Sequence, residues 1–310
     1  MKPRVLADAS RLWGHRFERV VHTYPGANTI LELSERRNGG ERRSFLKLAR
    51  PGQSTFELDF EARLLGAVLS GPEAAVAVPF PGKAARLRFR LPWEDRMRHA
   101  VLFAEAPGRV MRHDVSDMRR YGQSLAALHE VLAATSLAAS RRIDAAASCR
   151  ETAFWLRQAG LCTVPLAATV EALAPNLVAA LDAASPTQGL LHGDSCLLNA
   201  RLDEGERVTF FDFEDCGTGP VALDLASMTG WLEREENGPA LWAALLDGYA
   251  RHRALTPGDH LALPALAVLA TVRVTGRLAR FYAMAPGMWE EQHERLKGHS
   301  VERLAIGNKA

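Results

Sequence analysis

The first hundred residues alternate between apolar and polar positions in short runs, with the period of two that is typical of β-strands. Three such runs follow one another, at residues 16–23, 29–35 and 43–50. The pairs Pro25-Gly26 and Asn38-Gly39 separate them, and both pairs favour tight turns. We therefore expect three strands, joined by short turns, at the start of the chain.

A helix is expected after the third strand, because Ser54 and Glu57 form the S-x-x-E pattern of a capping box. This helix should end near Ser70, ahead of a Gly-Pro pair. Further strands are expected near residues 86–90 and at residues 101–103. The pattern thus predicts a small sheet accompanied by one helix.

Two charged residues in this region interrupt apolar patterns. Lys47 lies within the third strand, and Glu61 lies on the apolar stripe of the helix, three and four residues before two leucines. An ion pair between Lys47 and Glu61 would give each charge a partner. The alternative is that both side chains extend separately to solvent.

Beyond residue 109 the apolar positions recur with helical spacing, beginning with residues 117–132. Further helices are expected over residues 151–160, 165–184, 224–237, 239–252 and 259–284. A short β-like insert interrupts them, with a hairpin turn at residues 203–206. The pair Pro107-Gly108 ends the last N-terminal strand, so we predict an N-lobe at residues 1–103, a hinge at 104–108 and a helical C-lobe at 109–310.

Composition limits the classes of protein that fit this pattern. The 310 residues carry a net charge of +2, which gives no general argument for binding to nucleic acid or to an anionic membrane. The longest apolar run, residues 261–272, contains Pro264 and is too short to span a bilayer. The first residues show no signal-peptide core, and the four cysteines form no C-x-x-C pair. We expect a cytoplasmic protein without disulfides.

Two acidic motifs, HGD at residues 192–194 and DFED at residues 212–215, flank Asn199. The hairpin between them would bring Asp194, Asn199 and Asp212 to one edge. Oxygen ligands such as these are preferred by Mg²⁺, and a carboxylate can also orient a hydroxyl group and accept its proton. This arrangement suits phosphoryl transfer from a nucleotide, with Lys47 contacting the phosphates that are not transferred.

The HGD loop is also open to other interpretations. His192, Asp194 and Cys196 alternate as zinc ligands can, but a fourth ligand is not evident. The sequence around Ser195 does not match the G-x-S-x-G pattern of a hydrolase nucleophile. We interpret His192 as a structural, hydrogen-bonding residue. The role of Glu214 stays open: its carboxylate either contacts the metal, or lies beside the metal ligands or in solvent.

The strings HGDSCLLN and FFDFEDCGTGPVALDLA resemble the aminoglycoside phosphotransferase/choline kinase family. The resemblance implies an α+β, protein-kinase-like fold with two lobes, a small β-rich N-lobe and a larger, mostly helical C-lobe. Residues 195–198 are similar to the loop of some aminoglycoside 3′-phosphotransferases. DFEDCGTGP looks more like the homoserine-kinase-like and stress-response-kinase-like branches, so the substrate stays open.

The resemblance also implies roles for individual residues. Asp194 matches the catalytic base, and Asn199 and Asp212 match the magnesium ligands. Lys47 is similar to the phosphate-binding lysine of the third strand, and Glu61 to its helix partner. Main-chain groups that contact adenine are expected from Leu102, Phe103, Ala104, Glu105 and Ala106. Asp224 resembles a structural aspartate that braces the catalytic loop together with His192.

These features predict a kinase that uses ATP or GTP with Mg²⁺ and phosphorylates a hydroxyl group of a small molecule, such as an amino alcohol, an amino sugar or homoserine. A protein Ser/Thr kinase and a nucleotide-binding pseudokinase are the alternatives. Glu233, Glu235 and Glu236 fall in the last turn of the helix expected over residues 224–237. They suggest either a solvated helix end or an anionic rim for a cationic acceptor.

Overall fold

The computed structural model describes residues 2–26, 28–37, 40–68, 70–135, 137, 141–160 and 164–284. The chain divides into two compact units. The first unit consists of Met1–Val110, Thr135–Ser140 and Ala200–Glu214, and the second of Met111–Ala134, Arg141–Asn199 and Asp215–Ala310. Segments far apart in the sequence therefore fold together in each unit.

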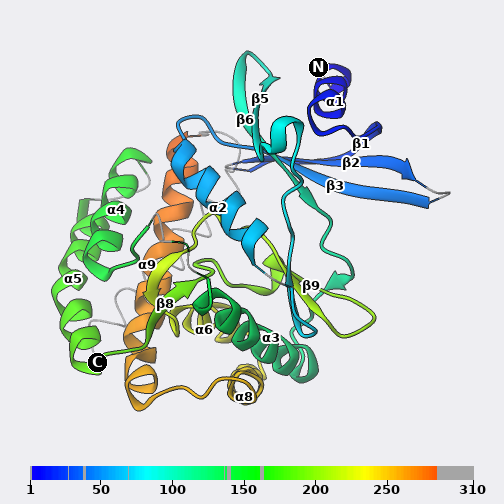
Figure 1. Ribbon diagram of the computed structural model, residues 1–310. Coiled ribbons are helices and arrows are strands. Elements are labelled where there is room, and N and C mark those ends of the chain that lie inside the picture. Colours follow the sequence, from blue (N-terminus) through cyan, green and yellow to red (C-terminus); the bar gives the residue numbers. More distant parts are fainter. Residues whose placement is uncertain are drawn as a thin grey trace. The chain divides into compact units, whose positions relative to one another are not determined.

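The first unit is built around an antiparallel five-stranded sheet with the order β1-β2-β3-β6-β5 (Figure 1). Its strands are β1 (Phe17–Tyr24), β2 (Thr29–Arg37), β3 (Gly40–Leu48), β5 (Arg88–Trp93) and β6 (Arg96–Ala104). Leu31, Leu33, Leu46 and Leu48 are fully buried and form the centre of its core. The expected strands are confirmed, while the turn expected at Asn38-Gly39 lies outside the described residues.

Helix α2 (Thr55–Ala67) begins where expected, but the capping box is wrong. Ser54 occupies the N-cap position, yet its side chain makes no capping hydrogen bond. The helix starts instead through the backbone, with the Leu58 N–H donating to the Ser54 carbonyl over 3.2 Å. The expected pattern placed the helix correctly without identifying what starts it.

A second helix in this unit, α1 (Lys2–Trp13), was not expected. Val5, Ala9 and Trp13 recur every four residues on one face and are buried against the five-stranded sheet. The Trp13 indole N–H also donates to the Phe80 carbonyl over 3.0 Å. The N-terminal region therefore has two α-helices in its described part, rather than the single one expected.

A four-stranded sheet with the order β4-β10-β9-β7 completes the first unit. Its strands are β4 (Ala74–Val76), β7 (Arg109–Val110), β9 (Ala200–Leu202) and β10 (Val208–Phe210). Strand β10 pairs in parallel with β4, and β9 pairs with β7. These hydrogen bonds place residues 200–214 in the first unit, so assigning the whole of residues 109–310 to one helical lobe was wrong.

The second unit is mostly helical (Figure 1). Its long helices are α3 (Val115–Ala133), α4 (Ala145–Gln158), α5 (Val164–Ala184), α8 (Gly238–Ala250) and α9 (Pro257–Met284). Strands β8 (Gln188–Leu191) and β11 (Gly217–Pro220) form an antiparallel pair, and a 3₁₀ turn, η2, covers Leu197–Asn199. Helices α4, α5 and α9 surround the main apolar core of this unit.

The single helix expected over residues 224–237 is wrong. Two short helices take its place, α6 (Leu223–Ala226) and α7 (Thr229–Leu232). Hydroxyl groups interrupt the helical pattern, because Ser227 Oγ donates to the Asp224 carbonyl over 2.8 Å and Thr229 Oγ1 to that of Ala226 over 2.7 Å. The Gly219-Pro220 pair, which precedes these helices, lies in β11.

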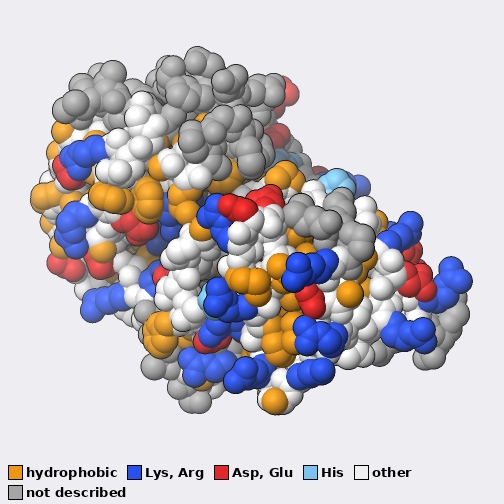
Figure 2. Space-filling model, turned by 90° about the horizontal axis from the view of Figure 1, so that it is seen from above, with side chains coloured by type: hydrophobic (Ala, Val, Ile, Leu, Met, Phe, Trp, Pro, Cys, Tyr) orange, Lys and Arg blue, Asp and Glu red, His pale blue; other side chains and the backbone are white. Residues whose placement is uncertain are grey.

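By length and composition alone, residues 166–184 of α5 and helix α9 could each cross a bilayer. Both also contribute to the apolar core of the second unit, and core helices of soluble proteins have the same composition. Basic and acidic side chains are interspersed on the face drawn in Figure 2, in keeping with the small net charge.

Helices α3 and α8 approach each other closely at glycines. A Cβ added at Gly122 of α3 would lie 2.1 Å from the Leu245 carbonyl oxygen. We therefore expect Gly122→Ala to lower the free energy of unfolding by roughly 1–3 kcal/mol, although alanine favours helix more than glycine does. Urea unfolding measures the change. Gly66→Ala in α2 is the control, because its added Cβ would come only within 4.0 Å of Pro79, and equal effects at both sites would contradict the prediction.

Candidate active site

The HGD loop of the second unit follows strand β8 and is held by one buried carboxylate. Asp224 Oδ2 accepts the His192 N–H over 2.7 Å, and Oδ1 accepts the Gly193 N–H over 2.9 Å. His129 Nε2 lies 3.0 Å from Asp224 Oδ2, and its Nδ1 lies 2.8 Å from the Tyr249 hydroxyl. The loop is thereby fixed to α3, α6 and α8.

The electrostatic state of Asp224 follows from these contacts. Its side chain is 1% exposed, and burial alone would raise the pKa of the carboxyl. The hydrogen bond from His129 and those from the loop amides outweigh burial and hold the pKa of Asp224 below its ordinary value. Asp224 is therefore a charged brace of the loop.

Gly193 allows the loop to turn sharply. Its φ is +83°, and a Cβ at this position would lie 2.0 Å from the Asp215 carbonyl oxygen. Only glycine fits both the left-handed conformation and this close approach. His192 is fully buried, and its Nδ1 accepts the Asp194 N–H over 3.3 Å. The central glycine of the HGD motif is thus required by geometry.

Asp194 and Asn199 are joined across the loop. Asn199 Nδ2 donates to the Asp194 carbonyl oxygen over 2.9 Å and to Asp194 Oδ2 over 3.2 Å. Arg277 Nη2 donates to the other carboxylate oxygen, Asp194 Oδ1, over 2.5 Å. Asn199 Oδ1 accepts no hydrogen bond from the described part of the chain, so this oxygen is available to a cation.

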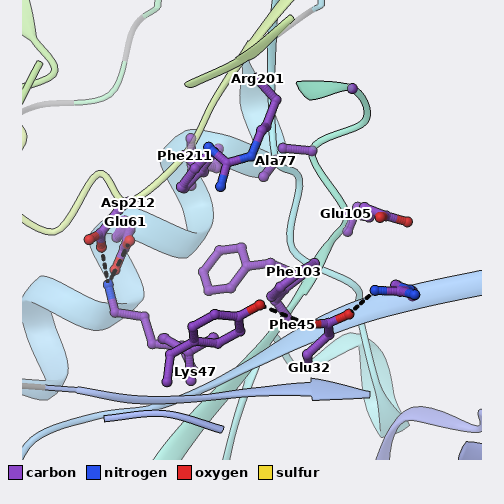
Figure 3. A pocket seen from close by; sticks show the side chains of 17 residues that line it. Glu32, Phe45, Lys47, Glu61, Ala77, Phe103, Glu105, Arg201, Phe211 and Asp212 are labelled. Atoms are coloured by element: carbon purple, nitrogen blue, oxygen red, sulfur yellow. Dashed lines mark hydrogen bonds and ion pairs between the residues drawn. The ribbon is translucent and has the colours of Figure 1, made fainter. Parts of the chain in front are cut away.

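The first unit contains a pocket of about 360 Å³, drawn in Figure 3. Lys47 reaches it from β3, and its Nζ lies 3.1 Å from both carboxylate oxygens of Glu61 and 3.1 Å from Asp212 Oδ1. Glu214 Oε2 lies 3.4 Å from the same ammonium group. The ion pair expected between Lys47 and Glu61 is present, and the alternative of separate solvated charges is wrong.

Three carboxylates therefore surround one ammonium group. Burial alone would lower the pKa of Lys47, but Glu61, Asp212 and Glu214 hold it well above its ordinary value. The lysine is charged. Arg50 Nη1 also lies 3.6 Å from Glu214 Oε2, and burial raises the pKa of Glu61 to about 7, so the three carboxylates exceed the two cations by at most one negative charge. A divalent cation would compensate this excess.

Asp212 has the position and chemistry of a ligand for such a cation. Its backbone is left-handed, with φ +63°, and its side chain is 43% exposed at the pocket. The described residues contain no group of three or more His, Cys, Asp or Glu side chains suited to hold a metal. A single carboxylate is compatible with Mg²⁺, which usually keeps several waters and binds substrate phosphates.

The residues expected at the hinge divide into two groups. Phe103, Ala104, Glu105 and Ala106 line the pocket. Leu102 does not, because it is fully buried in β6 and its carbonyl accepts the Phe80 N–H over 2.7 Å. Leu102 thus differs from the other four residues in lying outside the pocket lining, and the first unit continues past the expected hinge at 104–108 to Val110.

Several pocket residues were missed from the sequence. Tyr24 donates its hydroxyl to Glu32 over 2.8 Å, and Glu32 is also paired with Arg43. Opposite them, the guanidinium of Arg201 lies 5.0 Å from the ring centre of Phe211 (Figure 3). Glu32 is 4% exposed within an apolar strand, the same signal that identified Lys47, so it could have been found.

Comparisons with known proteins agree with these features. The model of the phosphotransferase enzyme family matches residues 34–292 of the chain. An uncharacterized protein of Deinococcus radiodurans is 31% identical over 287 residues, which cover 85% of this chain and 83% of that protein. The chain therefore belongs to the phosphotransferase enzyme family. It is a phosphotransferase that acts on hydroxyl groups.

Solved structures share the fold at low sequence identity. A microcompartment-associated aminopropanol kinase matches with a TM-score of 0.71 and 18% identity, covering 97% of this chain and 95% of that one. Amicoumacin kinase, in complex with AMP-PNP, Ca²⁺ and Ami, matches with a TM-score of 0.72 and 16% identity, and the match covers 99% of this chain and 93% of that one. Spectinomycin phosphotransferase with ADP and spectinomycin matches with a TM-score of 0.63 and 15% identity, and the match covers 100% of this chain and 99% of that one. The predicted α+β, kinase-like fold is confirmed.

The charge of Asp224 generates a pH-dependent prediction. Because its pKa is lowered by folding, its stabilising contribution is present above the unfolded value of about 3.9 and is lost as the pH falls through the folded pKa. We expect Asp224→Asn to lower the free energy of unfolding by about 3–5 kcal/mol at pH 7, as loss of a buried charged partner does. The difference from wild type should shrink below pH 4.

Urea unfolding at pH 7 and pH 2.5 measures both values, because the contribution is lost only as the pH falls through the folded pKa of Asp224, which lies below about 3.9. The matched control is Asp95→Asn, because Asp95 is exposed in the turn after β5 and its pair with Arg96 is screened by solvent, so its loss should have only a small effect on the free energy of unfolding at either pH. An Asp224→Asn effect of equal size at both pH values would show that the charge of this side chain is not what stabilises the loop.

Proposed function

We propose that the chain transfers the γ-phosphoryl group of ATP to a hydroxyl group of a small molecule, with Asp194 as the base. The observation that carries the proposal is the pocket in which Lys47 is surrounded by Glu61, Asp212 and Glu214. An ammonium group beside excess carboxylate is suited to bind phosphate oxygens and a divalent cation together. The pocket is also of the size that small-molecule sites have.

Each residue has a defined task in this proposal. The acceptor oxygen forms a bond to the γ-phosphorus, the bond from that phosphorus to the β–γ bridging oxygen breaks, and ADP leaves. The proton of the acceptor hydroxyl goes to the Asp194 carboxylate. Lys47 holds the non-transferred phosphates, and Glu61 orients Lys47. Asn199 and Asp212 would hold Mg²⁺, which neutralises charge on the phosphates.

The nucleotide and metal are supported by related structures. Amicoumacin kinase was solved with AMP-PNP and Ca²⁺, and spectinomycin phosphotransferase with ADP. We propose ATP rather than GTP on this basis. Phe103 to Ala106 would face the adenine ring, with Arg201 on the opposite wall of the pocket. An amino alcohol, an amino sugar and a homoserine-type compound are the acceptor classes to test.

Replacing the base tests the assignment of Asp194. We expect Asp194→Asn to reduce phosphoryl transfer by on the order of 10²-fold or more, since a general base contributes about that much. Binding of Mg·ATP, measured by calorimetry, should stay near the wild-type value because the base acts on the acceptor. Turnover of the variant close to that of wild type would remove Asp194 from this role.

Replacing the proposed metal ligand should behave differently. Asp212→Ala should weaken Mg·ATP binding and lower turnover together, and raised magnesium should restore part of both. Titration of magnesium at fixed ATP measures the shift in metal dependence. Asp95→Ala is the control for loss of an exposed carboxylate. An unchanged magnesium dependence in Asp212→Ala would mean that Asp212 is not a ligand.

A further inference from the structure

A second, small cavity of about 50 Å³ lies within the second unit. It is lined by four arginines, Arg141, Arg273, Arg277 and Arg280. We call them the arginine cluster. A space of this size can hold a few waters or one small charged group, but not a nucleotide.

The sequence of α9 brings three of these arginines together. Arg273, Arg277 and Arg280 are separated by four and three residues, so they lie on one face of the helix. Gly276, on the same face, packs against α4, because a Cβ there would lie 2.4 Å from Thr152 Oγ1. The close approach of the two helices directs this face toward Glu151 of α4, which lies 3.7 Å from Arg280.

The arginine cluster is connected directly to the HGD loop. Arg277 Nη2 lies 2.5 Å from Asp194 Oδ1, and its Nη1 lies 3.1 Å from Asp215 Oδ2. Arg273 Nη2 donates to the Gly193 carbonyl over 3.1 Å. A group bound among these arginines would therefore lie close to the carboxylate that we propose as the base.

The ion pairs of the cluster are unevenly distributed among its arginines. Among the described residues, the carboxylates that pair with them are Asp194, Asp215 and Glu151. Asp215 is shared by Arg141 and Arg277, and Asp194 is paired with Arg277. An unbalanced arginine charge is costly to bury, because guanidinium is always protonated.

Arg273 and Arg280 have the weakest pairing within the cluster. Within the described part of the chain, Arg273 contacts a carbonyl and no carboxylate. Among the described residues, the ion-pair partner of Arg280 is Glu151, whose side chain is 64% exposed, while Asp215 acts on Arg280 from a longer distance. Both arginines line the cavity and can still bind an anion.

We propose that the arginine cluster binds an oxyanion group of the acceptor, so that the acceptor is a hydroxyl compound carrying a carboxylate or a phosphate. This inference rests on the proposed function. Arg273 and Arg280 contact the oxyanion, which guanidinium recognises through paired hydrogen bonds. Arg277 is a positioning residue that stays paired with Asp194 and Asp215. The acceptor hydroxyl is thereby presented to Asp194.

The glutamates near residue 235 give no support to a cationic acceptor. The three of them no longer share a final helical turn, because α7 ends at Leu232. Glu235 lies 2.6 Å from His113 Nδ1 and so has its own partner. Among the acceptor classes considered, a homoserine-type compound carries a carboxylate, whereas a simple amino alcohol does not.

The test uses the full chain with Mg·ADP and measures acceptor binding by calorimetry. Three groups of probes are compared: homoserine, serine and glycerate for carboxylates, glycerol phosphate for phosphates, and ethanolamine and aminopropanol for cations without an oxyanion. We expect saturable binding in one of the first two groups, and which of them binds identifies the oxyanion. Arg280→Gln should weaken it roughly 10- to 100-fold, as loss of a charged hydrogen bond does.

Two further variants separate binding from a structural role. Glu151→Gln removes the carboxylate that competes for Arg280, so it should strengthen oxyanion binding a few-fold, opposite in sign to Arg280→Gln. Arg150→Gln removes an exposed charge from the same helix and should leave binding unchanged. Nucleotide affinity should be unchanged in all three variants.

Failure of this inference is distinguishable from failure of the proposed function. The inference is overturned if no oxyanion compound binds saturably, if only the cationic probes bind, or if Arg280→Gln and Arg150→Gln weaken binding equally. In each case phosphoryl transfer dependent on Asp194 could still be observed, and the proposed function would stand. Oxyanion binding without any transfer to the bound hydroxyl would overturn the proposed function and, with it, the presentation of an acceptor hydroxyl to Asp194.

Discussion

The buried carboxylate of Asp224 is the interaction on which the HGD loop depends. A loop outside regular secondary structure leaves backbone N–H groups that need partners when they are buried. Asp224 satisfies two of them and is itself held by His129, which in turn contacts Tyr249. One charge therefore connects the loop to helices far apart in the sequence, and the position of Asp194 follows from theirs.

The buried charge of the first unit, on Lys47, is neutralised differently from that of Asp224. Asp224 has its charge balanced by donors, whereas Lys47 is surrounded by more carboxylate than it can neutralise. The first arrangement is complete without a ligand and stabilises a loop. The second gains from a cation and is suited to binding. The two clusters thus differ in whether their charges are satisfied by the chain itself.

Sequence patterns predicted the strands, most helices and the Lys47–Glu61 pair, because each rests on local periodicity or on a charge within an apolar run. Long-range pairings were not accessible in this way. Strand β10 pairs with β4 across more than a hundred residues, and Arg277 reaches Asp194 from a helix that reads as simply apolar. The break between α6 and α7 was missed because hydroxyl groups, which are ordinary in sequence, bond to the helix carbonyls there.

The contact between α3 and α8 is reciprocal. Each helix places a glycine against a backbone carbonyl of the other, Gly122 against Leu245 and Gly248 against Arg119. Tyr249, which contacts His129, directly follows the second glycine. Backbone atoms cannot be repacked as side chains can, so a side chain larger than hydrogen at either glycine would force the two helices apart. The distance between these helices, and with it the support that His129 and Tyr249 give to the HGD loop, is therefore set by two hydrogen atoms.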